Sequence, residues 1–189
     1  MPLTQLIAEI EQKLRVDFGQ LDAWFGAPAG VRSHRPATGG WTIDQILEHV
    51  ALTNHYLLIL IEKATAKALK NAHGLDLAME LANRQSVRER LDEIGRPGAF
   101  AWTRPEHMEP RGLKTAPEVA ATLRQQLQQC RAVLARLPHG EGVLYRTTLS
   151  VHDLGKLDVY DFVYFLAKHA ERHVAQIEKV AAGYQKSNG

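Results

Sequence analysis

The sequence predicts an all-α protein built as a four-helix bundle with an extra crossover helix. Four long segments carry apolar residues at spacings of three and four, the period at which side chains share one face of a helix. Long connections adjoin these segments, so we do not expect a simple up-down-up-down array. The chain of 189 residues suits one domain with a sizeable core, and we expect a single domain over residues 1–189.

The first helix is predicted over residues 3–25, where an apolar stripe runs from Leu3 to Phe25 and charged residues lie mostly outside it. Residues 26–40 contain prolines and several glycines, so they are predicted to form a loop. The second helix opens at residue 41 and continues to about residue 69. Thr42 is its expected N-cap, and Gln45, three residues later, completes a capping box.

A helical crossover is predicted within residues 71–95, where apolar residues are frequent but less regularly spaced. Residues 96–114 are expected to be irregular because prolines recur in them. The third long helix is predicted over residues 116–137, with Thr115 and Glu118 as its capping box and Pro138 just beyond its end.

The second connection covers residues 139–157, with short extended pieces around residues 143–148. Asp158 is the expected N-cap of the last helix, which continues to the polar tail that begins at Gln185. This helix carries the residues of greatest chemical interest.

Charge and composition exclude several classes of function. The chain has 23 basic and 21 acidic residues, a formal net charge of +2, and its basic residues are scattered among acidic ones. A dedicated nucleic-acid surface would cluster its lysines and arginines, so we expect no nucleic-acid partner. The longest apolar run, residues 56–61, is too short to cross a bilayer, and no signal peptide is recognisable. We therefore expect no membrane partner, and the single cysteine fits a protein of the reducing cytoplasm.

Two further features concern packing. The single cysteine, Cys130, excludes an internal disulfide, and its place on the apolar stripe of the third helix indicates a core thiol and not a nucleophile. Leu58 and Leu60 lie beside the apolar seam of the second helix, and such leftover apolar positions predict a homodimer unless the crossover helix covers them.

The strongest candidates for chemistry are two histidines on the last helix. His169 and His173 share the apolar face that also carries Phe162, Leu166 and Ile177. Residues at i and i+4 lie about 5–6 Å apart at Cβ, so both imidazoles can reach one metal ion. Two buried histidines with other hydrogen-bond partners would produce the same pattern. A third ligand is needed to decide between these interpretations.

The second helix offers that ligand through a family resemblance. It begins with Trp41 and carries His49, while the last helix carries His169, His173 and then Gln176-Ile177. This combination resembles the DinB family, including its YfiT-like metalloenzymes. The resemblance implies an up-down-down-up bundle that holds a divalent metal, often nickel or zinc, on His49, His169 and His173. The chain has Leu157-Asp158 where the family commonly has Leu-Thr, a change that preserves a helix cap.

The chemistry of the three residues agrees with this resemblance. Three neutral imidazoles from facing helices leave coordination positions open, as in catalytic zinc sites, for a water or a substrate thiol. By helical phase, four residues could form a second shell around the ligands, although each could equally fill the bundle: Gln45, Thr53, Tyr56 and Gln176. Glu48 and Glu171 neighbour the ligands in sequence but should point away from them.

Two functions follow from these observations. The resemblance implies a metal-dependent enzyme, a transferase or hydrolase that uses a low-molecular-weight thiol or water against a small electrophilic substrate. The alternative is a non-catalytic metal-binding protein whose bundle serves interaction or dimerisation. A general acid or base near the open position would separate the two, and the sequence offers no compelling one.

Overall fold

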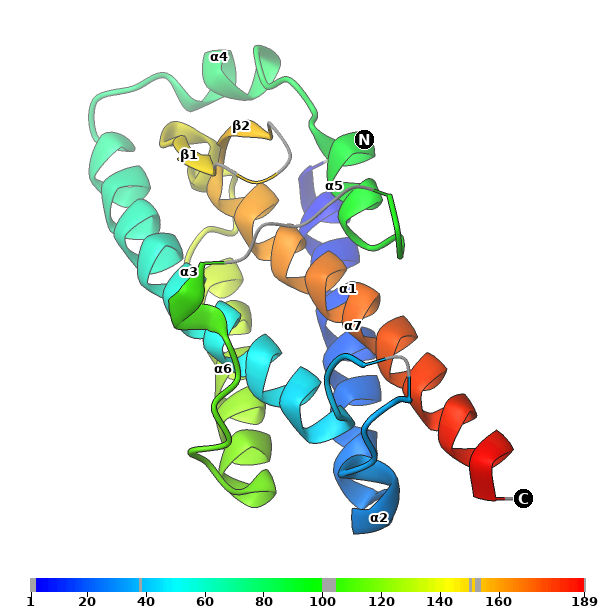
Figure 1. The fold of residues 1–189 in the computed structure, drawn as a ribbon. Coiled ribbons are helices and arrows are strands. Elements are labelled where there is room, and N and C mark those ends of the chain that lie inside the picture. Colours follow the sequence, from blue (N-terminus) through cyan, green and yellow to red (C-terminus); the bar gives the residue numbers. More distant parts are fainter. Residues whose placement is uncertain (1–2, 38, 100–104, 150, 152–153, 189) are drawn as a thin grey trace.

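A computed structural model describes residues 3–37, 39–99, 105–149, 151 and 154–188. Its four long helices form the predicted bundle (Figure 1): α1 (Leu3–Ala23), α3 (Ile43–Asn71), α6 (Ala116–Ala135) and α7 (Val159–Asn188). Helix α7 packs against α1 and α3, and α6 packs against the same two helices. The all-α fold is therefore confirmed.

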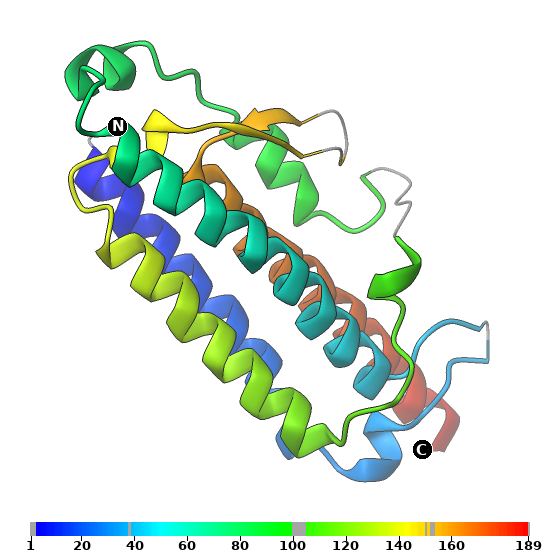
Figure 2. The same ribbon diagram turned by 90° about the vertical axis from the view of Figure 1, so that its left-hand side faces the viewer.

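The direction of each helix confirms the predicted topology. Helices α1 and α7 run one way along the bundle, and α3 and α6 run the other way (Figure 2). This is the up-down-down-up order. Because α3 and α6 are parallel, the chain between them must return along the whole bundle.

The predicted helix caps are present. Thr42 accepts from the Gln45 backbone at 3.2 Å, and the Gln45 side chain accepts from the Thr42 backbone at 3.0 Å. Glu118 accepts from both the backbone and the hydroxyl of Thr115. Asp158 accepts from the Asp161 backbone at 2.9 Å. These pairs satisfy N–H groups that have no partner within a helix, which is why each helix begins where the sequence indicated.

The first connection differs from the prediction in detail. Helix α1 ends at Ala23, two residues earlier than expected, because the chain tightens into the 3-10 helix η1 (Trp24–Gly26) before Pro28. The predicted loop then contains a short helix, α2 (Ala29–Arg32). Arg32 at its end pairs with Asp44 of α3 at 2.7 Å, which ties this segment to the bundle.

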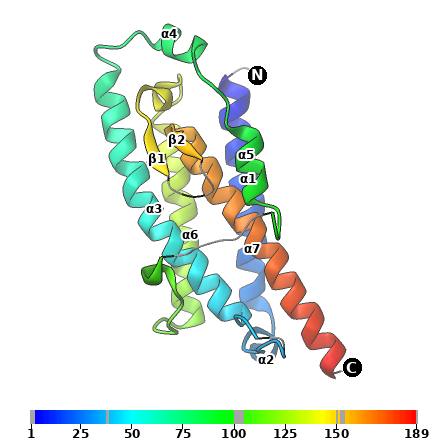
Figure 3. The same ribbon diagram turned by 45° about the horizontal axis from the view of Figure 1, so that its top comes forward.

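The described part of the crossover between α3 and α6 contains three short helices: α4 (Leu77–Ala82), α5 (Arg88–Ile94) and the 3-10 helix η2 (Glu106–Met108). Helix α4 lies across one end of the bundle, and α5 lies along α7 (Figure 3). Leu91 and Ile94 of α5 are fully buried. The crossover then meets α3 through η2, so it contacts both helices that carry the histidines.

The second connection contains the 3-10 helix η3 (Glu141–Leu144) and a two-stranded antiparallel sheet. Strand β1 (Thr147–Leu149) pairs with β2 (Gly155–Leu157), with Thr148 opposite Lys156. The extended piece predicted around residues 143–148 is thus real, but it begins later because residues 141–144 are helical.

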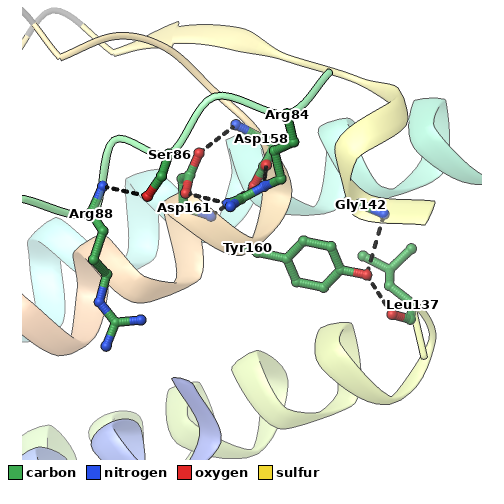
Figure 4. Close-up of polar contacts among 8 residues, drawn as sticks. All are labelled: Arg84, Ser86, Arg88, Leu137, Gly142, Asp158, Tyr160 and Asp161. Carbon is green, nitrogen blue, oxygen red and sulfur yellow. Dashed lines mark hydrogen bonds and ion pairs between the residues drawn. The ribbon is translucent and has the colours of Figure 1, made fainter. Parts of the chain in front are cut away.

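Polar contacts fix the start of α7 (Figure 4). Arg84, between α4 and α5, donates to Asp158 and to Asp161, each at 2.7 Å. The Tyr160 hydroxyl donates to the carbonyl of Leu137 at 2.5 Å. The first turn of α7 is therefore held by both connections at once.

The core is continuous along the bundle and includes Cys130, which is fully buried. Burial raises the pKa of its thiol to about 12, consistent with the predicted unreactive core position. Leu58, expected to remain exposed, is only 5% exposed and belongs to this core. Among the described residues, no helix is both long enough and apolar enough to span a membrane.

Candidate metal centre

Helices α3 and α7 bring the three predicted histidines together. His49 lies in the second turn of α3, and His169 and His173 lie near the middle of α7, which packs against α3. All three side chains are buried, with exposed fractions of 5%, 2% and 6%. One ring nitrogen from each can be chosen so that all lie within 4.8 Å of one another.

The spacing of these nitrogens suits a metal ion. His169 Nε2 lies 3.1 Å from His173 Nε2. Two nitrogens that each lie 2.0–2.1 Å from a tetrahedral zinc are about 3.3 Å apart. The His49 ring meets the His169 and His173 rings edge-on, at centroid distances of 5.5 and 4.9 Å. The donor set is therefore compatible with a divalent ion that prefers imidazole.

Hydrogen bonds hold two of the rings with Nε2 directed inward. His49 Nδ1 lies 2.8 Å from the carbonyl oxygen of Met108, in η2. A carbonyl can only accept, so His49 Nδ1 carries the proton and Nε2 presents a lone pair. His173 Nδ1 donates in the same way to Gln176 Oε1 at 2.8 Å. Such outer partners fix the tautomer of metal-binding histidines.

Aromatic rings pack on the same histidines. The Trp41 ring lies 4.7 Å from the His49 ring, and the Phe165 ring is stacked on the His169 ring at 6.1 Å. Trp41 directly precedes the N-cap of α3, so this packing gives the tryptophan at the start of the helix a physical role. The rings also limit the rotation of the two imidazoles.

Two of the histidines, His169 and His173, are held in the neutral form that binds metals. Burial, reinforced by the neighbouring histidines, lowers the pKa of His169 well below its usual value. Burial also lowers the pKa of His173 to about 3, with a further contribution from His49. Neither imidazole has to lose a proton at pH 7 before it binds a metal.

A cavity of about 670 Å³ opens beside the three histidines. One wall comes from α3 and a second from α7, and η2 and β1 complete it. Besides the histidines, its lining includes Trp41, Thr53, Tyr56, Leu57, Leu60, His107, Met108, Leu149, Phe165, Arg172 and Gln176. A volume of this order accommodates a small organic molecule.

The four residues predicted to surround the ligands occupy different places. Gln176 contacts His173 directly. Thr53 is buried and Tyr56 is 36% exposed, and both line the cavity. Gln45 does not line it, since its side-chain oxygen accepts from the backbone of Thr42 at the helix cap.

The two glutamates beside the ligands point away from the centre, as predicted. Glu48 accepts from the backbone N–H of Gly112 at 2.8 Å. Glu171 pairs with Lys13 of α1 at 3.0 Å and with Lys168. Neither residue lines the cavity.

Several residues of the site have little or no signal in the sequence. The Met108 carbonyl could not be recognised, because a backbone oxygen has no signature in the residue type. His107 lies in a proline-containing segment with no regular pattern that would mark a site, yet it lines the cavity and its ring meets the Tyr56 ring at 4.2 Å. Arg172 also lines the cavity, and its Nη1 donates to the carbonyl of Arg96 at 2.7 Å. Its position beside His173 was the only available signal.

Comparison with known proteins gave one result. A family model described as the DinB superfamily matches residues 20–177. That range includes all three histidines, the crossover and most of the bundle. Neither the curated proteins nor the solved structures gave a match.

Proposed function

The chain belongs to the DinB superfamily, and from this membership and the three-histidine centre we propose that it is a cytoplasmic metal-dependent enzyme. Its proposed activity is that of a transferase or hydrolase that acts on a small electrophilic substrate. The attacking group is a low-molecular-weight thiol or water. Zinc and nickel are the proposed ions, because the family resemblance implies them and imidazole suits both.

One observation carries the proposal: the three histidines border a cavity that has room for a substrate. A structural zinc site is normally closed by four protein ligands, whereas a catalytic site keeps a position open. Among the described residues, the group that could hold a metal consists of His49, His169 and His173. The cavity therefore favours the enzyme over the non-catalytic binding module.

Residues of the chain have distinct roles in this proposal. His49, His169 and His173 would hold the ion, which when bound would lower the pKa of a thiol or water at its open position. Met108 and Gln176 orient two of the ligands through their oxygen atoms. Apolar side chains from Leu57, Leu149 and Phe165 reduce the access of water to the centre.

The proposal is tested by metal analysis of protein purified without a histidine tag. We expect about one zinc or nickel ion per chain, and thiol conjugation of small electrophiles, or their hydrolysis, that stops when a chelator removes the metal. Protein that binds metal tightly but gives no metal-dependent turnover in a broad thiol and electrophile screen would favour the non-catalytic alternative. Protein that takes up no metal would exclude both.

A further inference from the structure

Two buried threonines on α3 differ in how their hydroxyls are satisfied. Thr65 is fully buried, and its hydroxyl donates to the carbonyl of Ile61, one turn earlier, at 2.8 Å. Thr53 is 5% exposed, yet its Oγ1 has no hydrogen-bond partner among the described residues. A buried hydroxyl without a partner lowers stability, so its presence at this position requires another explanation.

The position of Thr53 supplies that explanation. It lies four residues after His49, on the same face of α3, and it lines the cavity beside the three-histidine centre. Rotation about χ1 can direct a threonine hydroxyl toward a group in that space. As placed, Oγ1 is itself buried, so the hydroxyl gains a partner from the cavity only after such a rotation, and a ligand there can supply one.

The charges around the cavity define the head of such a ligand. Arg172 lines the cavity, and its Nη1 donates to the carbonyl of Arg96, just after α5. No described residue of the lining carries a carboxylate. An arginine and a bound metal ion on one wall both attract negative charge, so together they favour an anionic group.

Apolar side chains define the rest of the ligand. Leu57, Leu149 and Phe165 are each at least nine-tenths buried, and they form part of the same wall. Such surfaces gain free energy when they cover an apolar or aromatic body. The polar and apolar parts of the wall thus favour a ligand that has an anionic head and an apolar body.

We propose that the cavity binds a small organic anion with an apolar body, whose charged head lies at the three-histidine centre between the Thr53 hydroxyl and the Arg172 guanidinium. This inference rests on the proposed function, because it takes the three histidines as the metal ligands. Thr53 donates a hydrogen bond to the anionic head. Arg172 contributes charge and the planar geometry that suits a carboxylate. The apolar body lies against Phe165 and Leu149.

Three probes separate the parts of this ligand: benzoate, benzamide and acetate. Benzamide keeps the aromatic body without the charge, and acetate keeps the charge without the body. In calorimetric titration of the zinc-loaded protein, we expect benzoate to bind at least about tenfold more tightly than either of the others. Zinc content, measured on the same samples, shows separately whether the metal site has formed.

Matched variants test the two residues. Thr53→Val should weaken benzoate binding by about tenfold or more, the usual effect of losing a hydrogen bond to a charged group. Thr53→Ser, which keeps a hydroxyl, should restore it. Arg172→Met should weaken benzoate binding but leave benzamide binding unchanged. Thr65→Val is the control. It removes a buried hydroxyl from the same helix, but Thr65 does not line the cavity.

Melting temperature provides a readout that is independent of binding. Thr65→Val breaks an existing hydrogen bond and should lower it, whereas Thr53→Val breaks none and should keep or raise it. Benzoate that binds no better than benzamide, or binds Thr53→Val as tightly as the unaltered protein, would overturn the inference while leaving the metal centre intact. A protein that takes up no zinc would overturn the proposed function and this inference with it.

Discussion

At the scale of single residues, His173 makes the contacts that define the candidate metal centre. Its Nε2 faces His169, and its Nδ1 donates to Gln176. We predict that His173→Ala loses the bound metal but keeps the helical circular dichroism, because the bundle is stabilised mainly by its apolar seams. His73→Ala, which removes an exposed histidine beyond the end of α3, is the control. Unchanged metal content in His173→Ala would show that the ligands are assigned wrongly, and global unfolding would indicate a structural site.

The low pKa of His173 also has a consequence for stability. In metal-free protein, the unfolded chain takes up a proton at this residue near pH 6.5, whereas the folded chain does so only near pH 3. Acidification through this window therefore favours the unfolded state, by about 1.4 kcal/mol for each pH unit. Denaturant titrations of the unaltered protein and of His173→Gln measure this effect. As the pH falls, the unaltered protein should lose unfolding free energy relative to the variant.

That difference must be measured against a variant because another group has the opposite effect. Burial raises the pKa of Asp17 to about 6, so the folded state binds this proton before the unfolded state does. Acidification from pH 6 to 4 then stabilises the fold through Asp17. A difference between the two proteins that stays constant from pH 7 to 4 would contradict the assignment of a neutral, buried His173.

Among the structural elements, the start of α7 depends most on one ion pair. Arg84 is largely buried between Asp158 and Asp161, and its removal would leave two buried carboxylates side by side. We predict that Arg84→Met lowers the free energy of unfolding by about 3–5 kcal/mol. Burial, with Asp158 beside it, raises the pKa of Asp161, so the loss should be smaller at pH 5 than at pH 8.

An exposed arginine provides the control for this experiment. Arg124 of α6 also makes two hydrogen bonds to a carboxylate, that of Asp22, but its side chain is 64% exposed. Arg124→Met should lower the free energy of unfolding by at most about 1 kcal/mol. Equal losses in both variants would show that burial does not set the strength of the Arg84 pair.

The long helices could be predicted because each carries two independent signals. The apolar period identified α3, and the reciprocal pair of Thr42 and Gln45 located its first turn. The short elements lack such signals. Helix α2 has four residues, too few for a period to appear, and Arg32 at its end pairs with Asp44 of another helix, 12 residues later. Tertiary contacts of this kind are not visible in a local pattern.

The metal centre could be predicted only in part for a similar reason. The spacing of His169 and His173 places them on one helical face, and the family resemblance supplied His49. Of the two residues that orient the histidine rings, only one could be predicted. Gln176 lies three residues after His173 and follows from helix geometry, whereas Met108 lies 59 residues after His49 in an irregular segment. Its carbonyl reaches His49 because the crossover brings η2 against α3.

At the scale of the whole molecule, the predicted homodimer would use exposed apolar residues of α3 that also lie at the edge of the cavity. Ile59 and Leu60 are 41% and 40% exposed, although Leu58 is buried and does not contribute. We predict that light scattering shows a dimer, which Leu60→Lys converts to a monomer because a buried lysine disfavours the interface. Leu113→Lys, at a leucine that is 81% exposed in the crossover, should leave the dimer intact. A monomer at high concentration of the unaltered protein would reject this prediction.

The bond between His49 and the Met108 carbonyl affects how the site tolerates mutation. Every residue type has a backbone carbonyl, so a substitution at position 108 removes no oxygen from His49 as long as η2 keeps its path. Position 176 is different, because only a few side chains can place an acceptor 2.8 Å from His173 Nδ1. In a library of single substitutions selected for metal retention, position 108 should therefore accept many amino acids, and position 176 should accept few.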